Sequence, residues 1–469
     1  MIGTETTRQE SDHLGTVDIP AEALYGVNTW RGAQNLAFSG CPLQEEPEFA
    51  TAFAQCKLAA AYANRDHGVI SERVAGAIAR TCEELISGQH RQWLVVDIME
   101  GSGGTSTNMN FNEVIANRAQ QHLGGSLGKY DLVHPNDHVN RSQSTNDVYP
   151  SAMKIAVHGK LGVLAEEIEQ LAKSLDAKAL EFGDVLHLGR TCMQDAQPMY
   201  LGQAFGGYAS LTRRLAASLR QVQLQLLDLP LGGTAIGTGL GSPPGYKSTV
   251  FSHLSTMTGV PFQPAENPFD AMQNMDVFSR VSAELRTAAT SMAKIASDLI
   301  VQSSGPVGGL GEVMLPAVQA GSSIMPGKVN PVVAMGMVQV GFAIVGNDVC
   351  VAQAIQAGQL EINHFEPAVL SRVSDSISLL QRGARLFREK CIGGLQANAH
   401  RNETLALESS AIATAFIPQF GYDAVAAKVH QAVTEGRSFI GLMAQQGLIN
   451  EKDSRELVRQ AAKVVPTRN

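Results

Sequence analysis

The stretch GSSIMPGKVNP, residues 321–331, has the highest density of groups that could do chemistry. Two hydroxyls, Ser322 and Ser323, lie near the ammonium of Lys328 and the amide of Asn330. Such a set suits an anion, because the ammonium supplies a point charge and the amide supplies directional hydrogen bonds. Glycines at and before the stretch would let it move as a lid. We therefore expect a mobile loop that binds a small anion.

Two further polar segments, residues 101–110 and 142–147, are rich in hydroxyl and amide side chains. Neutral donors of this kind, together with backbone N–H groups, can hold a carboxylate or an oxyanion. Ser, Thr, Asn and Asp are also the residues that cap helices. Each segment taken alone favours capping. Residues 237–241, GTGLG, follow no strand, so we interpret them as a turn and not as a dinucleotide site.

Long helices must position these loops. Four segments carry apolar residues at alternating spacings of three and four, the pattern of helices packed nearly parallel in a bundle. Residues 332–351 add a fifth, almost wholly apolar segment. The sequence therefore predicts an all-α fold with a long central bundle. The striped segments contain Leu161, Leu164, Ile168, Leu171 and Leu175; Tyr208, Leu211, Leu215, Leu219, Val222 and Leu226; Phe278, Val281, Leu285, Ala288, Met292, Ile295 and Leu299; and Leu370, Val373, Ile377, Leu380, Ala384 and Phe387.

The positions of the stripes and loops suggest three domains. We expect a mostly helical N-terminal domain over residues 1–145. Residues 146–400 should form the long-helix bundle. The apolar stripes shorten after about residue 400, so residues 401–469 are expected to form a small helical C-terminal domain.

The amino-acid composition argues against several classes of protein. The 469 residues include 36 Lys and Arg against 44 Asp and Glu, a net charge of −8, with no basic block, which argues against nucleic acid as a partner. The polar N-terminus lacks the pattern of a signal peptide. Polar residues interrupt the apolar segment 332–351, so we expect a buried core helix and no membrane span. The six cysteines are widely spaced and predict neither a disulfide scaffold nor a zinc site. These features predict a cytoplasmic protein.

Four stretches, in this order, resemble signatures of the aspartase/fumarase superfamily. They are GTSTNMNFNEVIANRA from Gly104, HPNDHVNRSQSTND from His134, GRTCMQDAQPM from Gly189, and the GSSIMPGKVNP loop. Within the superfamily, HLGTVDIPAEALYGVNTWRG and GQLEINHFEPAVL are more similar to aspartate ammonia-lyases than to class II fumarases. The resemblance implies a homotetramer with a twenty-helix core and active sites built from three subunits each. It also implies a small C4 dicarboxylate or amino-acid substrate and no metal or organic cofactor.

The resemblance implies an elimination that leaves fumarate. A base removes a proton beside one carboxylate, which passes through a dianionic aci-form, and a group then leaves the neighbouring carbon. Hydroxyl and amide donors suit that intermediate. The resemblance makes Ser322 the base, its alkoxide stabilised by nearby donors or by Lys328. It assigns the aci-carboxylate to Thr105, Ser144, Thr145 and Ser323, the other carboxylate to Thr191, Lys328 and Asn330, and the surroundings of the leaving group to Asn146 and Thr105.

Two positions depart from the family pattern beside the leaving group. Cys192 stands where relatives carry His or Gln, and Met335 stands where they usually carry Glu. Ammonia could still be the leaving group, or the pocket could accept a larger one such as a substituted amine. Cys192 itself we interpret as a small packing residue. The loss of the His and Glu pair makes the hydration of fumarate to malate less favoured.

The leading hypothesis is therefore an aspartate ammonia-lyase. The alternatives are a lyase acting on a modified or N-substituted aspartate, a class II fumarase, and a catalytically silent paralogue. Ser322, Lys328 and Asn330 argue against the silent paralogue, since an inactive scaffold needs no base or carboxylate clamp. His134, Asn136 and Asp137 match a second anion site of some fumarases, but we favour a turn that stabilises its own loop.

Overall fold

A computed structural model describes residues 6–464 of the chain, which divide into two compact units. Unit 1 contains residues up to 165 together with 217–287 and 343–380, and unit 2 contains 166–216, 288–342 and the residues from 381 onward. All five boundaries between the units fall inside long helices. The three-domain division remains a prediction.

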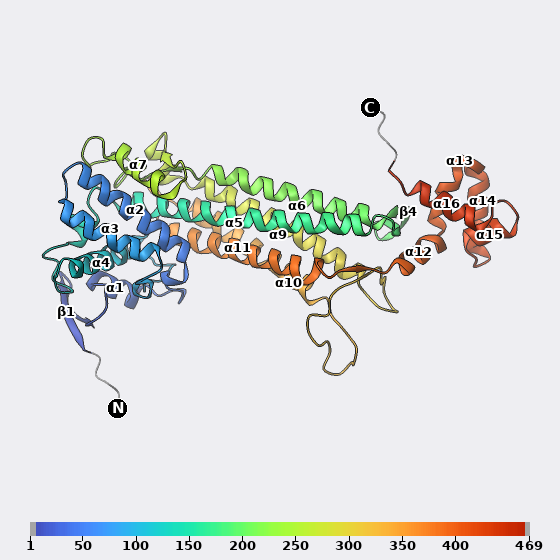
Figure 1. Cartoon of the computed structure of the whole chain (residues 1–469), viewed down its shortest axis with the longest axis horizontal. Coiled ribbons are helices and arrows are strands. Elements are labelled where there is room, and N and C mark those ends of the chain that lie inside the picture. Colours follow the sequence, from blue (N-terminus) through green and yellow to red (C-terminus); the bar gives the residue numbers. More distant parts are fainter. Residues whose placement is uncertain (1–5, 465–469) are drawn as a thin grey trace. The chain divides into compact units, whose positions relative to one another are not determined.

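Five long helices dominate the fold, as the apolar stripes predicted (Figure 1). Side-chain hydrogen bonds connect neighbouring long helices within each unit, for example Ser282 to Asp348 in unit 1 and Tyr208 to Asp298 in unit 2. The all-α prediction is confirmed. The helices are α5 (Thr145–Glu181), α6 (Leu201–Leu224), α9 (Asp276–Gln302), α10 (Val332–Gln356) and α11 (Glu366–Phe387).

Shorter elements complete unit 1. A β-hairpin and a group of helices precede α5, and α7 packs against α2. The elements are β1 (Thr7–Asp12), β2 (Gly15–Pro20), α1 (Val27–Asn35), η1 (Leu43–Glu45), α2 (Pro47–Asp66), α3 (Glu72–Ile86), η2 (Arg91–Trp93), α4 (Thr105–His122), η3 (Pro135–Val139), β5 (Asp228–Leu229), α7 (Tyr246–Thr258), β6 (Gln263–Pro264) and α8 (Pro268–Gln273).

Unit 2 contains a second antiparallel hairpin and the C-terminal helices. Its shorter elements are β3 (Leu186–Thr191), β4 (Gln194–Tyr200), β7 (Val313–Met314), η4 (Arg388–Ile392), β8 (Gln396–Ala397), α12 (Ala399–Glu408), η5 (Ser410–Phe416), α13 (Ile417–Phe420), α14 (Tyr422–Thr434), α15 (Phe439–Gln445) and α16 (Glu451–Ala461). The all-α prediction includes no hairpin, and residues 189–199 are the GRTCMQDAQPM stretch named above. In the structure they belong to the β3–β4 hairpin.

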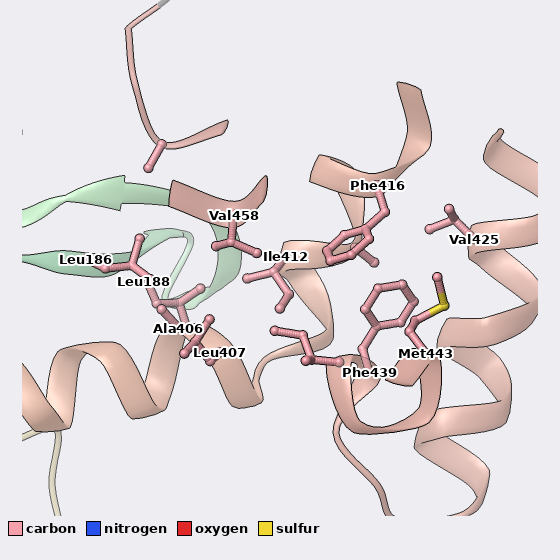
Figure 2. Close-up of a cluster of buried hydrophobic side chains, with 13 residues drawn as sticks. Leu186, Leu188, Ala406, Leu407, Ile412, Phe416, Val425, Phe439, Met443 and Val458 are labelled. Atoms are coloured by element: carbon pink, nitrogen blue, oxygen red, sulfur yellow. The ribbon is translucent and has the colours of Figure 1, made fainter. Parts of the chain in front are cut away.

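A buried apolar cluster joins the β3–β4 hairpin to the C-terminal helices (Figure 2). Leu186 and Leu188 of β3 belong to the same cluster as Phe416, Phe439 and Val458. The rings of Phe416 and Phe439 meet edge to face with centroids 5.1 Å apart, a favourable aromatic geometry. The hairpin is thus anchored by side chains from more than 200 residues later in the chain.

Helix α10 is as apolar as its sequence suggested, but most of it is not buried. Among the described residues it is the one helix long and apolar enough, by length and composition, to cross a membrane, and 28% of its most apolar window is buried. Phe342 is 71% exposed, and Val345 and Val349 continue the same stripe along the helix. The expected core helix is therefore not covered within a single chain.

The contact between α3 and α4 includes a carboxylate with several basic neighbours. Glu84 of α3 accepts two hydrogen bonds from the guanidinium of Arg118 in α4, at 2.8 and 3.1 Å. His90 and His122 approach the same carboxylate. Burial alone would raise the pKa of Glu84, but Arg118 and the two histidines outweigh burial and lower that pKa to about 2.

We predict that Glu84→Gln makes the fold less sensitive to acid. A carboxylate with a lowered folded-state pKa stabilises the fold above its unfolded pKa, about 4.3, and loses this effect as the pH falls toward 2. The melting temperature of the unmodified protein should therefore fall more steeply over that pH range than that of Glu84→Gln. Glu83→Gln, at the exposed neighbouring position, is the control. Parallel curves for all three proteins would contradict the prediction.

Candidate functional site

Two helices of unit 1 begin at candidate anion-binding residues. Thr105 is the first residue of α4 and Thr145 is the first residue of α5. The first N–H groups of a helix have no partner within the helix, and together with the helix dipole they favour a bound anion. A hydroxyl at each of these positions adds a further donor. At α4, however, the N–H groups of Ser106 and Thr107 are bonded to Ser102 and Glu100, so this helix start is capped and the threonine hydroxyl is the donor that remains.

The two helix starts touch because residue 104 is glycine. Gly104 has φ +89°, and a Cβ there would lie 2.6 Å from Cδ2 of Tyr149 and 3.2 Å from Cγ2 of Thr145. A side chain would therefore push α4 away from α5. The structure thus brings Thr105 and Thr145 of the predicted site close together. Ser144 and Asn146 flank Thr145.

Asp147 fixes the turn that carries Ser144, Thr145 and Asn146. One of its carboxylate oxygens accepts the N–H of Ser144 at 2.8 Å, and the other accepts the N–H groups of Gly232 and Thr234, both at 3.0 Å. Burial raises the pKa of Asp147 to about 6 despite these three hydrogen bonds.

Residues 232–235, which precede the 237–241 turn, therefore support the site. Asn146 also donates to the carbonyl oxygen of Ala235 at 2.9 Å. Thr234 has φ +56°, which is unusual for a β-branched residue, so its backbone is held in place by its surroundings.

Thr191 and Cys192 lie at the end of the β3–β4 hairpin in unit 2. Cys192 and Met193 form its turn with φ +51° and +61°, and both side chains are exposed. Arg190, next to Thr191, donates to the fully buried carboxylate of Glu312 at 2.8 Å. This ion pair connects the hairpin to the start of the segment that leads to Ser322.

The 321–331 loop, also in unit 2, folds back on itself. The Ser322 hydroxyl oxygen accepts the N–H groups of Ile324 and Met325, both at 3.2 Å. The N–H of Ser322 donates to the carbonyl oxygen of Lys328 at 3.3 Å. A Cβ on Gly321 would overlap that carbonyl, so this closure requires glycine.

The remaining loop candidates are solvent-accessible. Ser323 and Lys328 are exposed and Asn330 is half-buried. Met335 follows in the first turn of α10 and is also exposed. Within unit 2, no hydrogen bond between described residues joins this loop to Thr191 or Cys192.

The turn at His134 stabilises itself. The ring Nδ1 accepts the N–H groups of Asn136 and Asp137, both at 3.2 Å, and caps η3. This is the arrangement expected of a loop-stabilising turn. In the described part of the chain, no group of three or more His, Cys, Asp or Glu residues could hold a metal ion.

Comparison with known proteins connects these groups. A family profile described as Lyase matches residues 15–346. An aspartate ammonia-lyase from Pseudomonas fluorescens is 40% identical, with 99% of this chain and 98% of the relative aligned. The chain belongs to the aspartase/fumarase superfamily of lyases. It is therefore an enzyme of the lyase class, as the four sequence stretches suggested.

Solved structures agree with this family. A fumarate lyase:delta crystallin from Brucella melitensis bound to cobalt superimposes with a TM-score of 0.95 at 39% identity, covering 98% of this chain and 100% of that one. A class II fumarase from Schistosoma mansoni gives a TM-score of 0.91 at 32% identity, with 97% and 99% covered. The superfamily fold thus extends over nearly the whole chain.

Sequence reasoning missed the residues that support the site. Asp147 lies inside a recognised stretch, but its role depends on two N–H groups about 85 residues later. Lys57, which lies behind Thr145, carried no local signal, whereas Asn108 lies inside the GTSTNMNFNEVIANRA stretch but was assigned no role. The roles predicted for the ten candidate residues themselves remain predictions.

We predict that Gly104→Ala destabilises this member of the superfamily by about 2–4 kcal/mol, because it combines a left-handed backbone with overlap against Tyr149. Thermal unfolding would measure the change. Gly76→Ala is the matched control, since Gly76 lies within α3 with nothing near its Cβ position and alanine favours a helix. Equal melting temperatures for the two variants would show that the close approach at Gly104 is unimportant.

Proposed function

We propose that the chain is an aspartate ammonia-lyase, which reversibly eliminates ammonia from L-aspartate to give fumarate, with Ser322 as the base. The observation that carries this proposal is the 40% identity to an aspartate ammonia-lyase over essentially the full length of both chains. Identity to the class II fumarase is lower, at 32%. Loss of the family's His and Glu at Cys192 and Met335 also disfavours the hydration of fumarate.

The geometry around Ser322 supports its role as the base. An unperturbed serine hydroxyl is far too weakly acidic to become an alkoxide near neutral pH. The two N–H groups of Ile324 and Met325 that point at its oxygen would stabilise negative charge there, as the donors of an oxyanion hole do. Lys328, at the other end of the same loop closure, would bind the second carboxylate.

The paired helix starts support binding of the reacting carboxylate. Removal of a proton from the neighbouring carbon turns this carboxylate into a dianion, so donors that strengthen with charge stabilise the transition state more than the substrate. The hydroxyls of Thr105, Ser144 and Thr145 are such donors. In this proposal Ser323 completes the carboxylate site, Thr191 and Asn330 contact the other carboxylate, and Asn146 lies near the leaving group.

A second candidate function is elimination from an N-substituted aspartate. Cys192 and Met335 present small or flexible uncharged side chains where relatives usually carry polar ones, which would give a leaving-group pocket that tolerates added carbon. The amine leaving group would be the only difference between the two reactions.

Fumarate formation tests both proposals. Purified protein would receive L-aspartate, L-malate or one of several N-substituted aspartates, and ultraviolet absorbance would report the fumarate released. We expect turnover of L-aspartate. Turnover restricted to an N-substituted aspartate would favour the second candidate, and turnover of malate alone would favour a fumarase.

In the same assay Ser322→Ala should lower kcat by about 10²–10⁴-fold, the usual range for loss of a general base. Ser297→Ala removes an exposed hydroxyl that bonds only its own helix, and should leave the rate unchanged. Retained turnover by Ser322→Ala would refute the base assignment.

We also propose that the enzyme is a homotetramer whose active sites draw residues from three subunits. The exposed apolar stripe of α10 supports it, because an apolar surface of that kind indicates a partner. A second copy of this helix is the matching surface. The site residues come from helix starts, a hairpin and a loop that are far apart in the sequence, which also suits assembly from several chains.

Light scattering should therefore give a mass about four times the 49.9 kDa of one chain. Phe342→Asp should reduce this mass, because a charge would enter the apolar contact. Tyr422→Asp, at an aromatic residue equally exposed but far along the chain from α10, should not. A monomeric mass for the unmodified protein would refute the tetramer.

A further inference from the structure

A fully buried lysine lies behind the carboxylate-binding turn. Lys57 of α2 is 0% exposed, and its ammonium donates to Oδ1 of Asn108 at 2.7 Å and to Oδ1 of Asn140 at 3.0 Å. No carboxylate accepts a hydrogen bond from it among the described residues. Burying a charge with only amide partners is costly, so retaining a lysine here calls for a reason beyond packing.

The lysine fixes the direction of every hydrogen bond around it. An ammonium can only donate, so the oxygen atoms of both amides must face Lys57. The Asn108 nitrogen must then face the other way, where its two N–H groups reach Oδ1 of Asn140 and Oγ1 of Thr145, both at 3.1 Å. The Thr145 oxygen therefore accepts from Asn108.

This arrangement leaves the Thr145 proton available. No protein acceptor for that hydroxyl occurs in the described part of the chain, and the side chain is half-buried at the start of α5. The Thr145 hydroxyl is thus oriented as a donor toward the place where the proposed function puts the carboxylate. Hydrogen bonds in such a chain polarise one another in the direction of donation.

We propose that Lys57 is a positioning residue that acts through Asn108 to orient and polarise the Thr145 hydroxyl toward the carboxylate that becomes doubly charged. This inference rests on the proposed elimination. It adds two residues, on α2 and α4, to the set that determines the rate. Because the carboxylate gains charge in the transition state, Lys57 should act on kcat more than on KM.

The charged groups around Lys57 fit this role. Burial lowers the pKa of Lys57 to about 7, and the nearby charge of Asp147 opposes that shift. The oxygens of Asp147 are occupied by backbone N–H groups. Cys56 and Cys82, the other titratable groups that affect Lys57, are themselves buried, and burial raises the pKa of both thiols. A bound dicarboxylate would therefore supply negative charge that favours the ammonium form.

A double-mutant cycle tests the proposal. Lys57→Met keeps the length of the side chain without the charge, and Thr145→Val keeps the shape of threonine without the hydroxyl. We expect Lys57→Met to lower kcat by about tenfold or more with KM changed less than about threefold. In the Thr145→Val background the same substitution should lower kcat by less than about threefold, because its effect passes through the missing hydroxyl. An equal loss in both backgrounds would reduce Lys57 to a structural role.

Lys154→Met is the matched control. Lys154 is also a buried lysine of unit 1, but it donates to the backbone oxygen of Asp228 and to none of the site residues. Its replacement should leave kcat within about threefold of the unmodified enzyme. A tenfold loss there would show that any buried lysine of this unit matters equally, and would overturn the proposal.

A second variant covers the case in which Lys57→Met does not fold. Asn108→Asp keeps the shape of the side chain and an acceptor for Lys57, but the introduced carboxylate has no N–H to donate to Thr145. The Thr145 hydroxyl must then donate its proton to that carboxylate and no longer to the substrate. We expect a folded protein with kcat reduced by about tenfold or more, and full activity would overturn the proposal.

The proposed function and this inference fail separately. If the unmodified enzyme turns over another acid of the panel instead of L-aspartate, the proposed function fails. The kcat values of the double-mutant cycle are then measured with that acid as the substrate. If the unmodified enzyme turns over L-aspartate but the cycle is additive, only the role of Lys57 fails. An unmodified enzyme inactive on the whole panel would overturn both.

Discussion

The close approach of α4 to α5 is the contact on which the rest of the candidate site depends. It exists because Gly104 has no side chain where a Cβ would meet Tyr149. Two helix starts thereby present the Thr105 and Thr145 hydroxyls side by side. Asp147, in the first turn of α5, can then hold the turn before it. One missing side chain thus permits a cluster of neutral donors.

Neutral donors are suited to a charge that appears only during the reaction. Hydroxyls and amides that are held in place interact more strongly with the carboxylate as its charge grows, so they stabilise the dianion more than the substrate. Such donors need their own orientation fixed, because a hydroxyl can equally accept. In this chain buried charges lie behind them. Asp147 orders the backbone and Lys57 orders the amide of Asn108.

Regular features of the fold could be predicted because they repeat locally. The stripes of leucine and other apolar residues predicted four of the long helices, and the apolar 332–351 segment predicted α10. The β3–β4 hairpin could not be found this way. Its turn is formed by Cys192 and Met193, which lack the Gly, Asn or Asp expected at positive φ, and its register breaks after Leu188.

The site could be predicted only where side chains suited to chemistry lie close together in the sequence. Ser322 and Lys328 stand six positions apart, and their density signalled a loop that binds an anion. Lys57 sits in an alanine-rich stretch of α2, and its partners lie 51 and 83 residues later. No periodicity or motif of the linear sequence encodes such a contact, since it forms only when three elements pack together.

The apolar helix α10 shows why composition cannot identify a partner. A helix meets the length and hydropathy criteria for a membrane span whether lipid or protein covers it, because both environments exclude water.

The polar residues of α10 distinguish a protein partner from lipid. Asn347 donates to Asp375 and Ser376 of α11, and Asp348 accepts from Ser282 of α9, so this helix buries hydrogen-bonded polar groups against its neighbours at mid-length. Those contacts fix one face to the bundle, which leaves the Phe342 stripe facing outward. Such a stripe on a bundle helix fits another helix better than it fits lipid, because the charged Asp348 would otherwise lie at membrane depth.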